Sequence, residues 1–253
     1  MKMPKSFLSL TALIMLSACG GGGGSAGGTS TTTTAGSNPT TVNNTTTTES
    51  NPLTAGLGGS TTQTGGAVSV AIGFNDKIIV SPDDQQYFKD YIIKVVDNNG
   101  FPVKGATIAP RIDVVRYGKG FLNDQKTTPA PTDTFTLTAA CDSEDANGND
   151  VLDAAEDTNG DGKLTPSRAT VSLQAVNGLV TNNDGVVLFQ MQYPKNYAAW
   201  LAVRLTVSTK VSGSEGKSSE LFGLGFVAGD EKKPGAAFSS SPYGRSNTCT
   251  DAL

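Results

Sequence analysis

Apolar and polar residues alternate in short runs from about residue 68 onward, the pattern of half-buried β-strands. Asn- and Gly-rich turns close two of these runs, at residues 97–100 and 182–185. Outside the N-terminal apolar segment no long stretch repeats at the helical period, although residues 152–156 are compatible with one helical turn. Short strands joined by such turns predict a two-sheet β-sandwich. The expected strands are residues 68–72, 76–81, 87–96, 103–108, 112–117, 135–140, 169–176, 186–191, 199–208 and 221–227.

Aromatic residues in these strands are candidates for the core of the sandwich, because most aromatic side chains in such strands are buried. The candidates are Trp200, Tyr197, Phe189 and Phe135. The alternative is a sugar-binding platform, which would require exposed rings among Tyr87, Tyr117, Tyr193 and Trp200.

The first 18 residues have the composition of a secretory signal peptide. Lys2 and Lys5 precede an apolar segment at residues 7–16 that is too short to span a bilayer as a helix. The sequence Leu-Ser-Ala-Cys that ends at Cys19 resembles a bacterial lipobox, which implies that Cys19 becomes the lipidated first residue. Gly20 in place of Asp implies the outer membrane, and whether the chain faces the periplasm or the outside stays open. The alternative is an ordinary signal peptide with a chance cysteine.

Residues 19–66 are the lipidated cysteine and a linker of Gly, Ser, Thr and Asn, which is expected to remain disordered because it has little to bury. Such a flexible tether would have a root-mean-square reach of about 35–40 Å. Residues 67–253 are long enough for one folded domain with its own core.

Residues 141–168 gather acidic, Asn and Gly residues at alternate positions. An EF-hand loop places oxygen ligands at its positions 1, 3, 5, 7, 9 and 12, with a backbone carbonyl at position 7. Two consecutive frames fit this spacing. The first frame has Asp145, Asn147, Asn149, the Val151 carbonyl, Asp153 and Glu156. The second frame has Asp157, Asn159, Asp161, the Lys163 carbonyl and Thr165, with Gly162 at the sharp turn.

Each frame departs from the EF-hand pattern at one position. Asp150 stands where the first frame expects Gly, and Arg168 ends the second frame, so a borrowed carboxylate or a water would have to complete that site. Asp153, Glu156 or Asp157 are candidates to bridge two ions. We expect a structural Ca²⁺ site, since Mg²⁺ seldom uses a cage made only of protein ligands. The alternative is a solvated acidic loop.

With Cys19 assigned to lipid, Cys141 and Cys249 remain as an even pair in an oxidising compartment. They are predicted to form a disulfide that ties the C-terminal tail to the start of the acidic segment, and two free thiols are the alternative. The formal net charge is −4 with a pI near 4.9, and no basic stripe is visible, so nucleic-acid binding is not expected.

Two stretches are similar to bacterial immunoglobulin-like domains of the invasin and intimin kind. Residues 95–106, Val-Val-Asp-Asn-Asn-Gly-Phe-Pro-Val-Lys-Gly-Ala, resemble the early strand and turn of these domains. Residues 181–189, Thr-Asn-Asn-Asp-Gly-Val-Val-Leu-Phe, resemble the later T-x-x-x-G-x-A strand, with Val in place of Ala. Residues 117–120, the acidic segment at 141–168, residues 193–200 and residues 241–244 together with Cys249 resemble a lipoprotein subgroup with a calcium-loop insertion. The resemblance covers about residues 68–249 and implies an extracytoplasmic sandwich that serves as a stalk, spacer or binding module.

Catalysis is not expected, because the chain has no His and therefore no Ser-His-Asp or Cys-His arrangement. We expect an outer-membrane-anchored, calcium-stabilised immunoglobulin-like lipoprotein that contacts an envelope or surface protein in adhesion or envelope assembly. A single domain is a poor stalk, which favours an accessory or docking role. The alternatives are a module that binds a glycan and a passive structural spacer.

Overall fold

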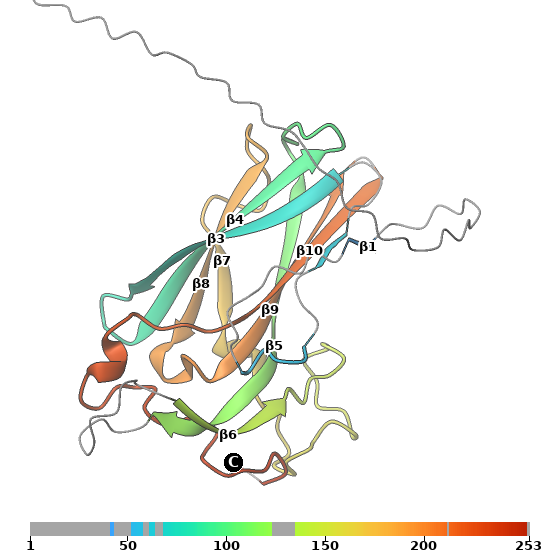
Figure 1. The fold of residues 1–253 in the computed structure, drawn as a ribbon. Coiled ribbons are helices and arrows are strands. Elements are labelled where there is room, and N and C mark those ends of the chain that lie inside the picture. The colour runs from blue at the N-terminus through green and yellow to red at the C-terminus, as the bar shows by residue number, and fades with distance from the viewer. Residues whose placement is uncertain are drawn as a thin grey trace, which may run out of the picture. The chain divides into compact units, whose positions relative to one another are not determined.

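The alternating runs form β-strands, and the strands form two antiparallel sheets in the computed structural model (Figure 1). The larger sheet has the order β1-β2-β10-β9-β5-β6 and the smaller sheet the order β3-β4-β8-β7. The prediction of an all-β sandwich is confirmed. The larger sheet consists of β1 (Thr41–Val42), β2 (Thr61–Gln63), β5 (Thr107–Leu122), β6 (Phe135–Asp142), β9 (Leu201–Val211) and β10 (Ser214–Gly223). The smaller sheet consists of β3 (Val68–Val80), β4 (Gln86–Asp97), β7 (Ser172–Ala175) and β8 (Val186–Pro194).

The structure describes residues 52–57, 68–122, 135–211 and 213–251, and the backbone of residues 41–42 and 61–63. The chain divides after residue 37, and every described residue belongs to the second unit. The expected signal peptide and Cys19 lie outside the described residues. Short 3₁₀ turns are present at η1 (Arg168–Thr170), η2 (Lys195–Tyr197) and η3 (Asp230–Lys232). Across the described part of the chain, no helix has the length and apolar character needed to cross a bilayer.

The core lies between the two sheets, because alternate residues of each strand point inward. In β4 the buried positions include Tyr91, Ile93 and Val95, and in β9 they include Val203 and Val207. The four aromatic core candidates follow this arrangement. Trp200 and Phe189 are each 1% exposed, and Phe135 and Tyr197 pack partly buried against the same core.

Three strands differ most from the prediction. β3 is one strand from Val68 to Val80, with a register shift between Phe74 and Ile78, where two runs at residues 68–72 and 76–81 were expected. β5 is one continuous strand from Thr107 to Leu122, where a break between residues 108 and 112 was expected. Pro110 fits inside it because β6 pairs with β5 only from Arg116 onward, so the missing N–H of Pro110 lies at an open edge. β10 begins at Ser214, well before the expected run at residues 221–227, and pairs with β9 along its whole length.

Part of the expected linker packs against the domain. Leu53 is 1% exposed, and its side chain lies near Gly118 and Trp200. The Arg116 guanidinium donates to the Ala55 carbonyl at 2.7 Å, and β2 pairs with β10. The folded unit therefore includes described residues on the N-terminal side of residue 67.

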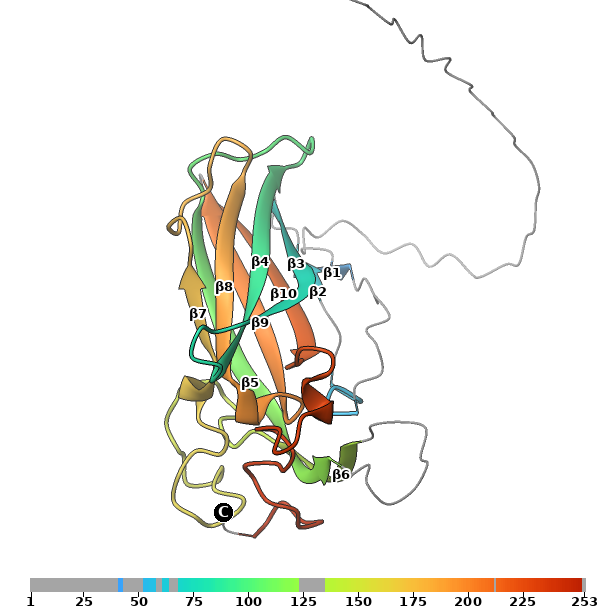
Figure 2. The ribbon, with the colours of Figure 1, turned by 90° about the vertical axis from the view of Figure 1, so that its left-hand side faces the viewer.

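The C-terminal segment after β10 lies at the end of the sandwich that carries the β5–β6 hairpin (Figures 1 and 2). It contacts β5, where Gly120 N–H donates to the Gly244 carbonyl at 2.9 Å. It also contacts β6, where the Thr138 hydroxyl donates to the Ser246 carbonyl at 2.9 Å. This path brings the end of the chain to the same end of the sandwich as the acidic segment.

Candidate metal centre

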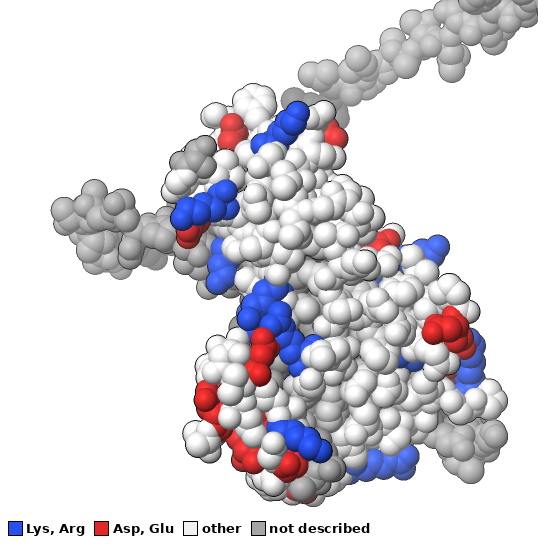
Figure 3. All heavy atoms as spheres, turned by 180° about the vertical axis from the view of Figure 1, so that it is seen from behind, with Lys and Arg blue, Asp and Glu red and all other residues white. Residues whose placement is uncertain are grey.

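The acidic segment connects β6 to η1, and it contains no strand or helix between residues 143 and 167. It extends from one end of the sandwich, and acidic side chains gather over this end when the molecule is seen from behind (Figure 3). The expected helical turn at residues 152–156 is a hydrogen-bonded turn in which Glu156 N–H donates to the Asp153 carbonyl at 2.9 Å.

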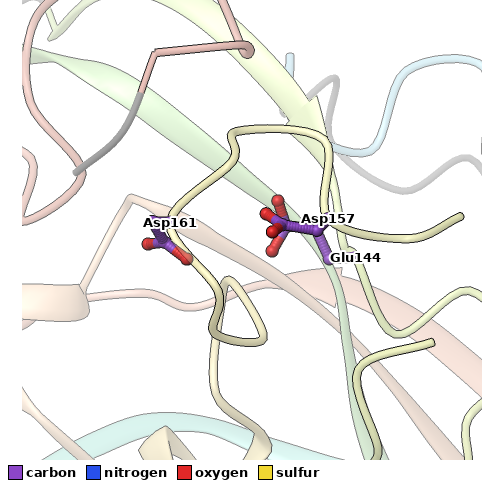
Figure 4. Close-up of side chains that lie close together, drawn as sticks. All are labelled: Glu144, Asp157 and Asp161. Carbon is purple, nitrogen blue, oxygen red and sulfur yellow. The ribbon is translucent and has the colours of Figure 1, made fainter. Parts of the chain in front are cut away.

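Three carboxylates converge inside this segment: those of Glu144, Asp157 and Asp161 (Figure 4). One oxygen from each lies within 4.8 Å of the others, and this is the one such acidic group among the residues that the structure describes. Asp157 and Asp161 are positions 1 and 5 of the second predicted frame. Glu144 precedes both frames and was not predicted as a ligand.

Glu144 is held in place by the loop that it enters. Its side chain is buried, with the residue 3% exposed. Oε1 accepts hydrogen bonds from the Thr158 and Asn159 N–H groups at 3.0 and 3.1 Å, and Oε2 accepts from Thr165 N–H at 2.9 Å. The second frame has Arg168, not a carboxylate, at its last position. Glu144 therefore supplies the carboxylate that this frame lacks.

The other side chains of the second frame are ordered around the same point. Asn159 Oδ1 accepts from Asp161 N–H at 2.9 Å, and Asp161 Oδ1 accepts from Lys163 N–H at 2.8 Å. These side-chain-to-backbone bonds two residues apart are Asx-turns, which bring successive oxygens to one side of a loop. Asn159 Nδ2 donates to the Thr165 hydroxyl at 3.2 Å. This bond fixes the orientation of the side-chain amide, so that its Oδ1 atom faces Asp161 N–H.

Asp157 has an oxygen that the protein leaves unbonded. Its Oδ2 accepts from Gly162 N–H at 3.2 Å. Its Oδ1 is inaccessible to solvent and has no hydrogen-bond partner among the described residues. A buried carboxylate oxygen without a donor is costly unless a cation satisfies it. The donor set, which is entirely oxygen, fits a hard cation such as Ca²⁺.

The first frame forms a separate network beside the second. Asp145 Oδ1 and Asn147 Oδ1 both accept from Asn149 N–H at 2.9 Å. Asn149 Oδ1 accepts from Val151 N–H at 2.8 Å. Asp153 and Glu156 belong to this network, because Asp153 Oδ2 accepts from the Asn147 amide at 2.7 Å and Glu156 Oε1 accepts from Ala146 N–H at 3.1 Å. The frame is therefore assembled, with its oxygens engaged by backbone and amide N–H groups.

A disulfide and an aromatic pair connect the acidic segment to the C-terminal tail. The sulfur atoms of Cys141 and Cys249 are 2.00 Å apart, the pairing that the sequence predicts. Tyr117 lies directly opposite Cys141 in the β5–β6 pairing, and its ring centroid is 4.6 Å from that of Tyr243. Burial, together with the negative charges of Glu144, Asp251 and Asp161, raises the pKa of Tyr117 to about 12. Tyr117 therefore lies within electrostatic reach of both the carboxylate cluster and the tail.

Comparisons with known proteins find nothing similar: no protein-family model matches the chain, and neither the curated proteins nor the solved structures include a match.

Proposed function

We propose that this chain is an extracytoplasmic β-sandwich module, lipid-anchored at the outer membrane, in which Ca²⁺ orders the end of the sandwich that carries residues 143–167. The observation that carries the cation proposal is the cluster of Glu144, Asp157 and Asp161, in which Asp157 Oδ1 is buried without a donor. Three carboxylates within 4.8 Å repel one another, and a divalent cation would relieve that repulsion.

The ligand set that we assign to the first ion comes from two passes of the chain. Glu144 enters from the end of β6, and Asp157, Asn159, Asp161 and the Lys163 carbonyl come from the second frame. This set is rich in charge, which favours tight binding among oxygen-ligand sites. The first frame also offers three carboxylates, at positions 1, 9 and 12, but these do not converge and its oxygens already accept N–H bonds, so it is the weaker candidate for a second ion.

A contact role in adhesion or envelope assembly fits the remaining features of the molecule better than a sugar platform does. Tyr87 and Tyr193 are 0% exposed, and Tyr117 and Trp200 are 1% exposed, so none of these rings is available for stacking on a sugar. The immunoglobulin-like assignment and the partner, an envelope or surface protein, belong to the proposal and rest on the sequence resemblance. A passive spacer would have no specific partner.

The anchor belongs to the same proposal. Lipidation at Cys19 rests on the lipobox-like sequence alone. Because Leu53 is buried and β1 (Thr41–Val42) pairs with β2, the tether that we propose between lipid and domain is shorter than residues 19–66 and ends before residue 41.

The cation proposal is tested by thermal unfolding and calorimetric titration of the metal-free protein with Ca²⁺ and with Mg²⁺. We expect Ca²⁺ to raise the melting temperature, because a ligand that binds only the native state stabilises it. Asp157→Asn removes one charge at constant shape and should weaken binding, whereas the matched control Asp184→Asn, in an exposed turn, should not. An unchanged melting temperature in saturating Ca²⁺ and in excess chelator would refute the site.

Tyr117 provides a spectroscopic readout of the same site. Terbium replaces Ca²⁺ at oxygen sites and emits when a nearby aromatic ring transfers excitation to it. We expect Tb³⁺ emission on tyrosine excitation, its suppression by excess Ca²⁺, and a weaker signal in Tyr117→Phe. Equal emission from Tyr117→Phe and from Tyr117→Phe/Tyr243→Phe, whose two rings lie 4.6 Å apart, would mean that the ion lies elsewhere.

The anchor and contact proposals are tested in cells. The wild-type chain should fractionate with membranes and Cys19→Ser should not. Cross-linking in intact cells with Ca²⁺ should capture a recurrent envelope or surface protein with the domain. Failure to capture any recurrent protein would favour a passive spacer, and membrane association of Cys19→Ser would remove the lipid anchor.

A further inference from the structure

A pocket of about 440 Å³ lies away from the acidic segment, where the start of β4, the link from β8 to β9 and the segment after β10 meet. Its volume falls in the range of small-molecule sites, which is roughly 300–1,000 Å³. Polar and apolar groups share the lining about equally, and the polar ones include two lysines and two aspartates. The four charges balance, but they differ greatly in their exposure.

Lys195 is the central positive group of this pocket. It is 7% exposed, and its backbone N–H donates to the Gln85 carbonyl at 2.9 Å, which fixes the residue at the pocket wall. Its ammonium lies 3.5 Å from Asp230 Oδ2 and 5.0 Å from the centre of the Tyr87 ring. A buried ammonium has lost most of its hydration, so it requires anionic partners.

Asp230 belongs to the permanent structure of the pocket. It is 5% exposed, and the Tyr87 hydroxyl donates to its Oδ2 at 2.5 Å while the Lys233 ammonium lies 2.5 Å from its Oδ1. Burial opposes ionisation of Asp230, but the hydrogen bonds from Lys233 and Tyr87 and the charge of Lys195 lower its pKa. Both of its carboxylate oxygens are therefore engaged, Oδ2 by Tyr87 and Lys195 and Oδ1 by the exposed side chain of Lys233.

Asp84 is the second partner of Lys195, and unlike Asp230 it is exposed to solvent. Its carboxylate contacts the Lys195 ammonium, yet its side chain is 71% exposed. The turn that carries it is held by other bonds, including Gln86 N–H to the Ser81 hydroxyl at 2.9 Å and Asp84 N–H to the Ser81 carbonyl at 3.0 Å. The Asp84 side chain can therefore leave Lys195 for water without loss of the bonds that hold the turn, and Asp230 remains as a partner of the buried ammonium.

We propose that this pocket binds the carboxylate of a small polar molecule, which replaces the Asp84 carboxylate on Lys195. When Asp84 is displaced, the two ammonium groups of Lys195 and Lys233 share one carboxylate, that of Asp230. The pocket then has a net charge of +1, which a ligand carboxylate would neutralise. The nearby Asp230 carboxylate favours a singly charged ligand over a doubly charged phosphate, because like charges repel at this distance. The amides of Gln85 and Asn196 line the same pocket and suit a hydroxyl-bearing scaffold such as a hexuronic acid.

This inference does not depend on the proposed cation site. The experiment titrates the full chain with glucuronate and, as the matched neutral probe, with glucose, each with and without Ca²⁺. We expect glucuronate to bind in both conditions and glucose to show no binding. Asp84→Asn removes the competing carboxylate and should tighten glucuronate binding by at least about 2–5-fold, the range of an exposed ion pair, because Asp84 is exposed while Lys195 is buried.

Substitution of Lys195 tests its role as the binding group for the carboxylate. Lys195→Met should abolish binding, and the control Asp184→Asn should leave the affinity unchanged. If Lys195→Met does not fold, Asp84→Asn still decides the question, because only a ligand that competes with Asp84 gains from it. Absence of binding to both the wild type and Asp84→Asn, equal binding of glucose, or binding only in the presence of Ca²⁺ would each overturn the proposal.

Discussion

Asp150 and Arg168 form an ion pair in which Arg168 Nη1 lies 2.5 Å from Asp150 Oδ2. These are the two positions at which the acidic segment departs from the EF-hand pattern. Asp150 adopts the left-handed conformation that the pattern reserves for Gly, with φ of 63°. Arg168, which cannot bind a cation at the last position of the second frame, also donates from Nε to the Ile112 carbonyl of β5 at 3.2 Å. Arg168 therefore connects the first frame, through Asp150, to strand β5, through the Ile112 carbonyl.

The Asp150–Arg168 pair should be worth little in stability, because the two side chains are 42% and 40% exposed. In a double-mutant cycle of Asp150→Asn and Arg168→Gln, we expect a coupling energy of about 0.2–1 kcal/mol. Chemical denaturation of the two single variants and the double variant measures it. A coupling energy of zero would mean that the two substitutions act independently and that the pair does not join the loops.

The disulfide should contribute much more than that ion pair. It closes a loop with a sequence separation of 108 residues, for which chain entropy gives up to about 4–5 kcal/mol. Thermal unfolding with and without a dithiol reductant should show a clear loss of stability on reduction. The Cys141→Ser/Cys249→Ser double variant should be less stable and indifferent to the reductant. Mass spectrometry that found both thiols free in the unreduced protein would contradict the bond.

The sequence predicted strands correctly where apolar residues alternate. It did not predict strands that consist of polar residues and are buried by their neighbours. The first half of β10 was missed because it is a run of Ser, Gly, Glu and Lys, and it is a strand only because it pairs with β9. Ser218 and Ser219 are 4% and 6% exposed without any hydrophobic signal of their own. Leu53 was missed for a related reason, since the short stretch Leu-Thr-Ala-Gly-Leu at residues 53–57 lies in a long segment of Gly, Ser, Thr and Asn whose composition predicts disorder.

The sequence predicted which segment carries the candidate site, but it did not predict the full set of ligands. Spacing alone identified Asp157, Asn159 and Asp161, because EF-hand loops supply ligands from alternate positions of a single stretch. Glu144 lies before both frames, just after β6, and a turn of the chain that no spacing rule encodes brings it to the cluster. The one available signal was the second frame's missing terminal carboxylate, which indicated that a donor from elsewhere was needed.

Asp251 should stabilise the domain through Lys119. Lys119 is 0% exposed, and its ammonium lies 2.6 Å from Asp251 Oδ1, so Asp251→Asn leaves a buried charge without its counter-charge. We expect a lower melting temperature for Asp251→Asn at neutral pH and an unchanged one for the exposed control Asp184→Asn. An Asp251→Asn protein as stable as wild type at neutral pH would show that other groups neutralise Lys119.

The same pair sets a pH dependence. Hydrogen bonds from Lys119, Ser246 and Thr248 lower the pKa of Asp251 below its ordinary value. A carboxyl whose folded pKa is depressed stabilises the fold above its unfolded pKa of about 4, and this contribution is lost as the pH falls further. The difference in melting temperature between wild type and Asp251→Asn should therefore shrink in acid. A constant difference down to low pH would contradict the ion pair as its source.

The buried tyrosines should make the fold sensitive to alkali. Burial raises the pKa of Tyr91, Tyr193 and Tyr243, and burial with the charges of Glu144, Asp251 and Asp161 raises that of Tyr117 to about 12. Between the unfolded pKa of about 10 and these raised values the folded state holds more protons than the unfolded state, so stability falls as the pH rises. Denaturant midpoints should decline above about pH 10, and the decline should be shallower in Tyr117→Phe. Phenolate absorbance should appear mainly as the protein unfolds. If these tyrosines ionise near pH 10 while the protein stays folded, they are not buried.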